Sequence, residues 1–240
     1  MRIVKSIIAG DNVRYESILS ELAHDTIVIA NDQDAIIQAI TANAKFHIAI
    51  TNEKFARVIA PATEIMLLDS LNFNSNEWRS LVDDFPNTRI MMCKPNQFRY
   101  NIGRMVALTN ASTEVSIKCI TVDETYNTVG DHIPEILSIM CRIEPGYANS
   151  TRILDSYNLS IMVDGRKLKA QNIFMKSGNS SKYRITFYMA ELTESIELGT
   201  CPESAYTTMI VDAMENLHNA IFWTKQLEYD TWIHQQLQYL

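Results

Sequence analysis

Apolar and polar positions alternate in two different ways along this chain. Over the first hundred residues, short continuous apolar runs are separated by amphipathic segments. The apolar runs predict strands at residues 3–10, 26–32, 46–51, 64–70 and 88–95, and the continuous run at 64–70 is typical of a strand buried on both faces. The segments between them predict helices at 13–23, 32–44, 53–62 and 74–85. Strands that alternate with helices predict a parallel sheet with helices packed on its faces.

After residue 110 the pattern changes to two-residue alternation. Strands are predicted at 113–122, 156–163, 167–175, 183–192 and 195–199, and one helix at 130–143, with Pro134 in its first turn. Asp164-Gly165 is a strong hairpin signal. Ile185 and Phe187 alternate with polar residues. We therefore expect an antiparallel meander with one packed face and one open face.

A long helical segment is predicted from Ser204 to the C-terminus. Side chains with a large apolar part recur there every four residues, counting the long hydrocarbon stem of the one lysine. They are Leu217, Ile221, Lys225, Tyr229, Ile233 and Leu237. This stripe favours core or subunit packing over a membrane-surface helix, because the segment lacks a basic face. The fold class is thus α/β. A parallel unit at 1–110 precedes an α+β unit with an open, mainly antiparallel sheet at 111–240.

Composition excludes several function classes. The 240 residues include only 7 glycines, about 3% against roughly 7% in average proteins. They are too widely spaced to form G-x-G-x-x-G or G-x-x-x-x-G-K-[ST], so no intact glycine-rich phosphate loop exists. The net charge is −7, without the basic excess of a nucleic-acid binder.

The cysteines and the apolar runs bear on compartment. The 4 cysteines are widely spread and none has C-x-x-C spacing, so neither a metal site nor a redox motif is expected. No run approaches the length of a membrane span, and the N-terminus lacks a cleavage-site pattern. We expect a cytoplasmic protein with reduced thiols, no metal, no membrane and no nucleic acid.

Two strand-to-helix corners carry candidate ligand-binding residues. Gly10 ends the first strand, where dinucleotide-binding folds turn towards a pyrophosphate. Asp32 follows the second strand, where an acid can accept hydrogen bonds from a ribose diol. Asp32 can equally cap the next helix, and the corner alone favours the cap.

Two further residues could carry acid–base chemistry. Lys94 follows an apolar strand, at the end of a parallel sheet where ligands bind, although a surface lysine is equally consistent. His132 stands near a predicted helix start with Glu135 one turn on. Such a histidine can be a general acid or base, a cap or a packed ring.

Lys94 and His132, in this domain order, resemble the glucose–fructose oxidoreductase, inositol dehydrogenase and MocA family. In that family a Glu-Lys-Pro motif ends a strand of an N-terminal Rossmann domain. RIMMCKP is similar at Lys94 and Pro95, with Cys93 in place of the glutamate. TVGDHIPEIL is similar to the second motif at His132, with Glu135 at the trailing aspartate and Thr128 at the catalytic aspartate.

The resemblance implies an NAD(P)-dependent oxidoreductase acting on a sugar, polyol or related carbonyl or imine. Lys94 and His132 would be the catalytic pair. The cofactor would be bound by Gly10, Asn12, Asp32 and Pro95, and the substrate by Thr128 and Glu135. NAD is favoured over NADP, because Asp32 would repel a 2′-phosphate.

Three departures from the family support a second hypothesis. The glycine loop is reduced to Gly10, Cys93 replaces the glutamate, and Thr128 is no carboxylate. The alternative is a catalytically inactive member that serves as a binding or assembly subunit. In either case we expect a homo-oligomer through the C-terminal sheet, because an open sheet and an aromatic-rich terminal helix offer apolar surface.

Overall fold

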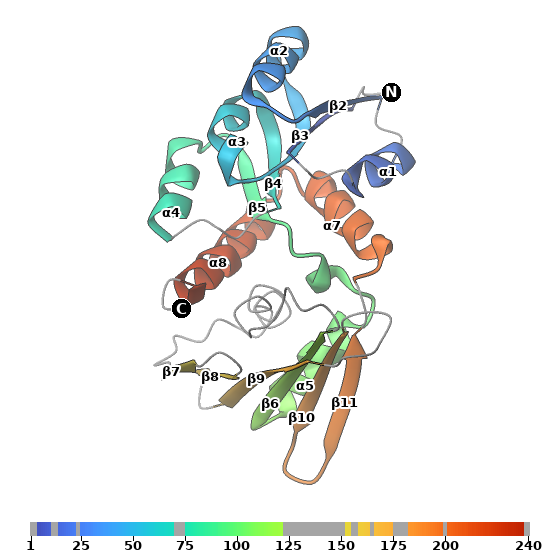
Figure 1. Ribbon diagram of the computed structural model, residues 1–240, viewed down its shortest axis with the longest axis vertical. Helices are drawn as coiled ribbons and strands as arrows, with labels where there is room; N and C mark the ends of the chain where they lie inside the picture. The colour runs from blue at the N-terminus through green and yellow to red at the C-terminus, as the bar shows by residue number, and fades with distance from the viewer. Residues whose placement is uncertain are drawn as a thin grey trace. The chain divides into compact units, whose positions relative to one another are not determined.

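The computed structural model describes residues 4–10, 14–22, 25–69, 75–121, 152–154, 158–163, 166–174, 182–198 and 201–237 (Figure 1). The chain forms two compact units. One contains residues 1–95 together with 206–238, and the other contains 96–205. The C-terminal helices therefore belong with the first unit, whereas the division expected at residue 110 assigns them to the second.

The first unit contains the predicted parallel sheet. Its strands are β1 (Lys5–Ala9), β2 (Thr26–Ala30), β3 (Phe46–Thr51), β4 (Thr63–Leu68) and β5 (Arg89–Met92). All neighbours are parallel, in the order β2-β1-β3-β4-β5. In each of the central strands β1, β3 and β4 all residues but one are buried, as the continuous apolar run of β4 predicts. The fold class predicted for this part of the chain is confirmed.

Helices cover both faces of this sheet (Figure 1). They are α1 (Arg14–Glu21), α2 (Gln33–Asn43), α3 (Glu53–Ile59), a short 3₁₀ helix (Ala60–Ala62) and α4 (Ser75–Asp84). The strand order reverses after β2, so right-handed crossovers place α1 on one face and α2 and α3 on the other. On the second face Ile7 and Ala9 of β1 pack with Ile36 and Phe55. The reversal creates a switch point between the ends of β1 and β3, where parallel α/β folds bind ligands.

The C-terminal segment forms two helices, so the prediction of one helix is wrong. They are α7 (Glu203–Glu215) and α8 (Ala220–Leu237). The break is made by Asn219, whose Oδ1 accepts a hydrogen bond from the Phe222 backbone N–H at 3.2 Å. Its Nδ2 donates to Asn216 Oδ1 at 2.8 Å. Asparagine interrupts helices in this way because its side chain competes for backbone partners.

The described members of the predicted apolar stripe on α8, Ile221, Lys225 and Tyr229, are not among its buried residues. Ile221 is 72% exposed, so the prediction of core packing for this stripe is wrong there. The buried face consists instead of Trp223, Gln226, Asp230 and His234. Three of these four are polar, and their burial requires partners on other elements. Helix α8 packs against α4 and β5, and the partners lie there.

The second unit is built on a mixed sheet beside α5 (Ile102–Ala111). Its strands are β6 (Glu114–Thr121), β7 (Arg152–Leu154), β8 (Asn158–Val163), β9 (Arg166–Phe174), β10 (Lys182–Tyr188) and β11 (Thr193–Leu198). The order is β11-β10-β6-β9-β8-β7, antiparallel except for the parallel pair β6–β9. The mainly antiparallel sheet is confirmed, but the simple meander is wrong. Strand β6 lies between β9 and β10, a pairing that local turn signals do not reveal.

The alternation in β10 divides that sheet into two faces, as predicted. Ile185 and Phe187 are buried, and the residues between them face solvent. On the open face Arg184 forms an ion pair with Glu197, and the Thr186 hydroxyl hydrogen bonds to Ser195 at 3.0 Å. The described part of the open face is therefore polar. The predicted helix at 130–143 and the turn at 164–165 lie outside the described residues. Within the described ranges, none of the helices has the length and apolarity needed to cross a bilayer.

Candidate functional site

The site is the carboxyl end of the parallel sheet, where the predicted residues Gly10, Asp32 and Lys94 follow β1, β2 and β5. Gly10 has φ +86° and its N–H donates to the Ala30 carbonyl at 3.1 Å. A Cβ on Gly10 would lie 2.7 Å from Asn52 Nδ2. Only glycine satisfies both the backbone angle and this contact. The Asn52 side chain, from the end of β3, thus lies against Gly10 at the switch point.

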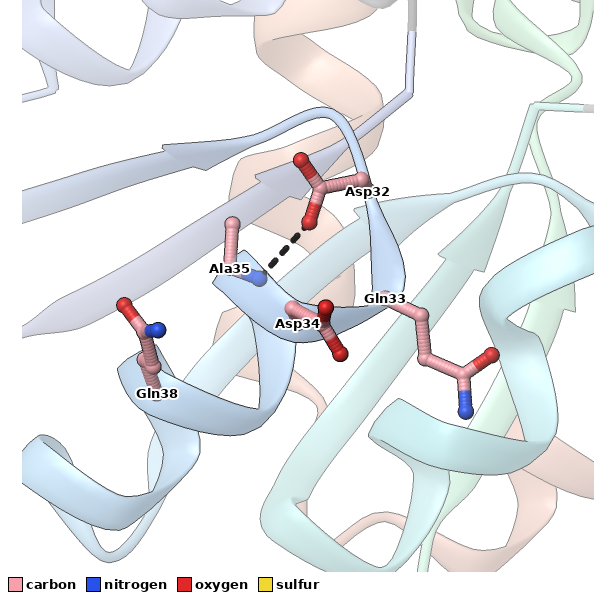
Figure 2. A pocket seen from close by; sticks show the side chains of 5 residues that line it. All are labelled: Asp32, Gln33, Asp34, Ala35 and Gln38. Atoms are coloured by element: carbon pink, nitrogen blue, oxygen red, sulfur yellow. Dashed lines mark hydrogen bonds between the residues drawn. The ribbon is translucent and has the colours of Figure 1, made fainter.

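Asp32 occupies the N-cap of α2. Its Oδ1 accepts a hydrogen bond from the Ala35 backbone N–H at 2.8 Å, so the capping interpretation is confirmed. Its Oδ2 accepts no hydrogen bond from the described residues. Figure 2 shows an open pocket around this first turn, lined by Asp32, Gln33, Asp34, Ala35 and Gln38. The position predicted to bind a ribose is therefore exposed, polar and acidic.

Lys94 follows β5, as predicted, but its side chain is buried. The residue is 1% exposed, and its Nζ forms an ion pair with Asp230 Oδ1 of α8. Nζ also donates a hydrogen bond to Gln226 Oε1 at 3.1 Å. The second oxygen, Asp230 Oδ2, accepts from the Met92 backbone N–H at 3.0 Å. One carboxylate therefore binds the lysine and a backbone donor of the edge strand β5 together.

The electrostatics of this pair follow from burial. Burial raises the pKa of Asp230, and the Lys94 ammonium and the Met92 N–H oppose that rise. Asp230 is 0% exposed, so both charges are removed from water. Helix α8 is fixed nearby by His234, whose ring stacks on Trp78 of α4 with a centroid distance of 4.8 Å. The lysine is thus held by a helix that is itself anchored in the core.

A second polar cluster lies where α1 meets the ends of β4 and β5. Tyr15 of α1 is 0% exposed, and its hydroxyl faces the Cys93 thiol and the Asp69 carboxyl without a hydrogen bond of ordinary geometry. Its ring packs edge-on against Tyr206 of α7 with a centroid distance of 5.6 Å. Tyr206 accepts a hydrogen bond from Arg14 Nη1 at 3.1 Å. These side chains form a continuous group at the carboxyl edge.

Burial shifts the pKa values of the titratable groups in this cluster. Burial raises the pKa of Tyr15 well above its usual value, and the neighbouring Cys93 and Asp69 add to the rise. Burial also raises the pKa of Asp69, which Arg14 and the Tyr15 hydroxyl partly offset. Cys93 is partly exposed as a residue, but its thiol lies deep enough that burial raises its pKa. Titratable groups whose pKa values are shifted in this way at a sheet edge often mark functional sites.

The remaining predicted residues are only partly placed. Pro95 is buried and begins a 3₁₀ helix (Pro95–Phe98). Asn12, Thr128, His132 and Glu135 lie outside the described residues. The structure thus brings Gly10, Asp32 and Lys94 to one edge, and the pairing of Lys94 with His132 stays a prediction. Within the described ranges no group of His, Cys, Asp or Glu side chains is arranged to hold a metal.

Sequence reasoning missed the partners of both clusters. Asp69 carried a signal, because an acid directly follows the continuous apolar run of β4. Gln226, Asp230 and His234 also carried one, since polar side chains recur every four residues on a helix. Nothing in the sequence links Asp230 to Lys94, which lies 136 positions away.

Comparison with known proteins shows the fold. No family model matches the chain, and no curated protein matches it. Solved structures do match over nearly whole chains. UDP-N-acetylglucosamine 3-dehydrogenase GnnA from Acidithiobacillus ferrooxidans has a TM-score of 0.67 at 6% identity, covering 100% of this chain and 97% of that one. The myo-inositol 2-dehydrogenase from Lactobacillus plantarum has a TM-score of 0.66 at 10% identity, covering 99% and 96%.

A third match is a complex with a nicotinamide cofactor. KijD10, a 3-ketoreductase from Actinomadura kijaniata in complex with NADP and TDP-benzene, has a TM-score of 0.64 at 8% identity, covering 100% of this chain and 97% of that one. The chain therefore has the fold of sugar dehydrogenases and ketoreductases, as the resemblance predicted. At identities this low, the fold alone is shown.

Proposed function

We propose that this chain is a non-catalytic relative of the sugar dehydrogenases that serves as a binding or assembly subunit. The observation that carries the proposal is the buried ion pair of Lys94 with Asp230. A lysine that acts on a substrate must come within roughly 2.6–3.2 Å of the reacting oxygen. Here the ammonium is enclosed and already bound by a carboxylate and an amide.

Releasing the lysine for catalysis would be costly. Breaking a buried ion pair leaves an uncompensated charge in the protein interior, at a cost of about 3–5 kcal/mol. A substrate hydroxyl or carbonyl is neutral and does not replace the lost carboxylate. Asp230 is also held by its second oxygen, Oδ2, which accepts from the Met92 backbone N–H, so the carboxylate cannot follow the lysine without leaving that donor unpaired. The arrangement favours a structural role for Lys94.

The fit of a nicotinamide dinucleotide to these residues is poor. Asp32 fits a ribose diol, because its Oδ2 is available in an open pocket. The lysine end does not fit, because Lys94 faces α8, and Asn52 lies against the one remaining glycine of the loop. We therefore assign no hydride-transfer step to this chain.

An NAD(P)-dependent oxidoreductase acting on a sugar, polyol, carbonyl or imine is the second candidate. It is favoured by Asp32, which stands where a dinucleotide-binding fold has its ribose-binding acid. The same carboxylate would favour NAD over NADP, since it repels a 2′-phosphate. In this candidate Lys94 and His132 would be the acid–base pair, and Lys94 would have to exchange Asp230 for substrate.

Hydride transfer distinguishes the two candidates. We expect no change in nicotinamide absorbance when the chain, at stoichiometric amounts, is mixed with NADH or NADPH and a panel of keto-sugars and imines. The reverse reaction with NAD, NADP and polyols should likewise give no change in nicotinamide absorbance. Turnover that disappears in the Lys94→Ala variant would overturn the proposal and establish the oxidoreductase.

Assembly is the positive part of the proposal. We place the interface on the open face of the second unit's sheet, where Tyr188 is 40% exposed between polar residues. Light scattering after size exclusion should give a multiple of the 27.4 kDa chain mass. Thr186→Lys, which adds a charge to that face, should shift the mass towards 27.4 kDa. A monomer at all concentrations would contradict this part. Neither Cys93 nor Cys201 forms a disulfide, in keeping with our proposal of a reducing, cytoplasmic compartment.

A further inference from the structure

Tyr15 stands at a position where dinucleotide-binding loops have glycine. In G-x-G-x-x-G the third glycine lies five residues after the first and lets the helix pack closely on the strand. Counting from Gly10, that position is Tyr15, the second residue of α1. Asn12 occupies the position of the second glycine. The largest change in the loop is therefore a glycine replaced by a buried aromatic ring.

The direction of the Tyr15 side chain, from α1 towards the ends of β4 and β5, places its ring over the switch point. Tyr15 belongs to the helix that follows β1, and its hydroxyl faces Asp69 and Cys93, which follow β4 and β5. Strand β3 lies between β1 and β4 in the sheet. A ring that starts beside β1 and ends beside β4 must therefore cross the carboxyl end of β3. This crossing covers the crevice between β1 and β3.

Asn52 lies at the same switch point, beside Gly10. It directly follows β3, and its Nδ2 lies 2.7 Å from where a Gly10 Cβ would be. It makes no capping hydrogen bond to α3, although it stands at the N-cap. Its Oδ1 is buried without a hydrogen-bond partner among the described residues. Because no local bond requires it there, Asn52 contributes mainly by occupying space.

The charges around the crevice give a phosphate no net attraction, because the Arg14 cation is opposed by the Asp69 carboxyl. Asp69 faces Tyr15 from the end of β4, and Arg14 of α1 lies near enough to lower the Asp69 pKa while it donates a hydrogen bond to Tyr206 of α7. Arg14 offsets only part of the effect of burial on Asp69. A pyrophosphate entering here would meet two phenol rings and a guanidinium opposed by a carboxyl group, instead of a row of backbone N–H donors.

We propose that Tyr15 and Asn52 determine ligand specificity by excluding the pyrophosphate of a dinucleotide from the switch point. This deepens the proposed function, because it gives the chain a second barrier to cofactor use besides the Lys94 ion pair. The two barriers are independent. One acts on binding at the ends of β1 and β3, and the other acts on chemistry at the end of β5.

The test measures binding of ADP-ribose by calorimetry. ADP-ribose carries the pyrophosphate and lacks the nicotinamide, so its binding does not depend on Lys94. The natural chain and the shape-preserving control Tyr15→Phe should show no saturation up to about 1 mM ADP-ribose, a concentration at which any Kd tighter than roughly millimolar would be seen. Tyr15→Gly combined with Asn52→Ser should bind at least tenfold more tightly.

Folding of the variants is checked first by circular dichroism. Asn52→Ser alone is a milder change, because Asn52 is partly exposed and caps nothing, and it should improve ADP-ribose binding several-fold without loss of structure. Submillimolar binding by the natural chain would overturn the inference. Folded variants that bind no better than the natural chain would overturn it too. Neither result bears on hydride transfer, which tests the proposed function separately.

Discussion

Replacing Lys94 by methionine is expected to lower the free energy of unfolding of the first unit by about 3–5 kcal/mol. The variant leaves Asp230 buried at 0% exposure without its counter-charge. Asp230→Leu should lower the free energy of unfolding by a similar amount, because it leaves the Lys94 ammonium without a counter-charge and removes the acceptor of the Met92 N–H. The double variant Lys94→Met/Asp230→Leu should recover most of the loss, since an apolar pair of similar volume is often as stable as the ion pair.

Urea unfolding followed by tryptophan fluorescence measures this effect. All 3 tryptophans, at 78, 223 and 232, lie in the stretches of sequence that form the first unit, so the signal reports that unit alone. Lys225→Met is the matched control, because Lys225 lies exposed on the same helix. It should change stability by less than about 0.5 kcal/mol. If Lys94→Met unfolds at the same urea concentration as this control, the ion pair contributes nothing and the structural role fails.

The parallel sheet could be predicted because its signal is local. The apolar runs mark all five strands of the first unit, and the central strands β1, β3 and β4 are buried on both faces, whereas Ile29 of the edge strand β2 is 42% exposed. The alternation of Ile185 and Phe187 predicted the faces of β10 for the same reason. Such patterns depend only on side chains two to four positions apart.

The chain end was harder to predict, because its burial depends on distant partners. Helix α8 buries Gln226, Asp230 and His234 and exposes Ile221, which reverses the rule that apolar residues face the core. Asp230 is stable in the interior because Lys94 and the Met92 N–H bind it. Hydrophobic periodicity cannot detect a buried face whose members are polar.

The position of the candidate site could be predicted from the sequence, but the contacts that its side chains make could not. The sequence located Gly10, Asp32 and Lys94 at the ends of their strands, because the carboxyl edge follows from strand order. It did not indicate that Tyr15 would reach Asp69 and Cys93, or that Asp230 would bind Lys94. Those contacts join elements far apart in the chain and become visible only when the sheet is assembled.

The reactivity of the Lys94 amine tests the central claim most directly. Brief acetylation of the folded chain, with each lysine quantified by mass spectrometry, compares Lys94 with the exposed Lys54 and Lys225. An ion pair worth about 3 kcal/mol should slow acetylation of Lys94 on the order of a hundredfold relative to those two. Asp230→Asn should remove much of this protection. A lysine that is held as a structural ion pair gives this result, whereas a Lys94 that reacts as fast as Lys225 would be free to act on a substrate and would contradict the account.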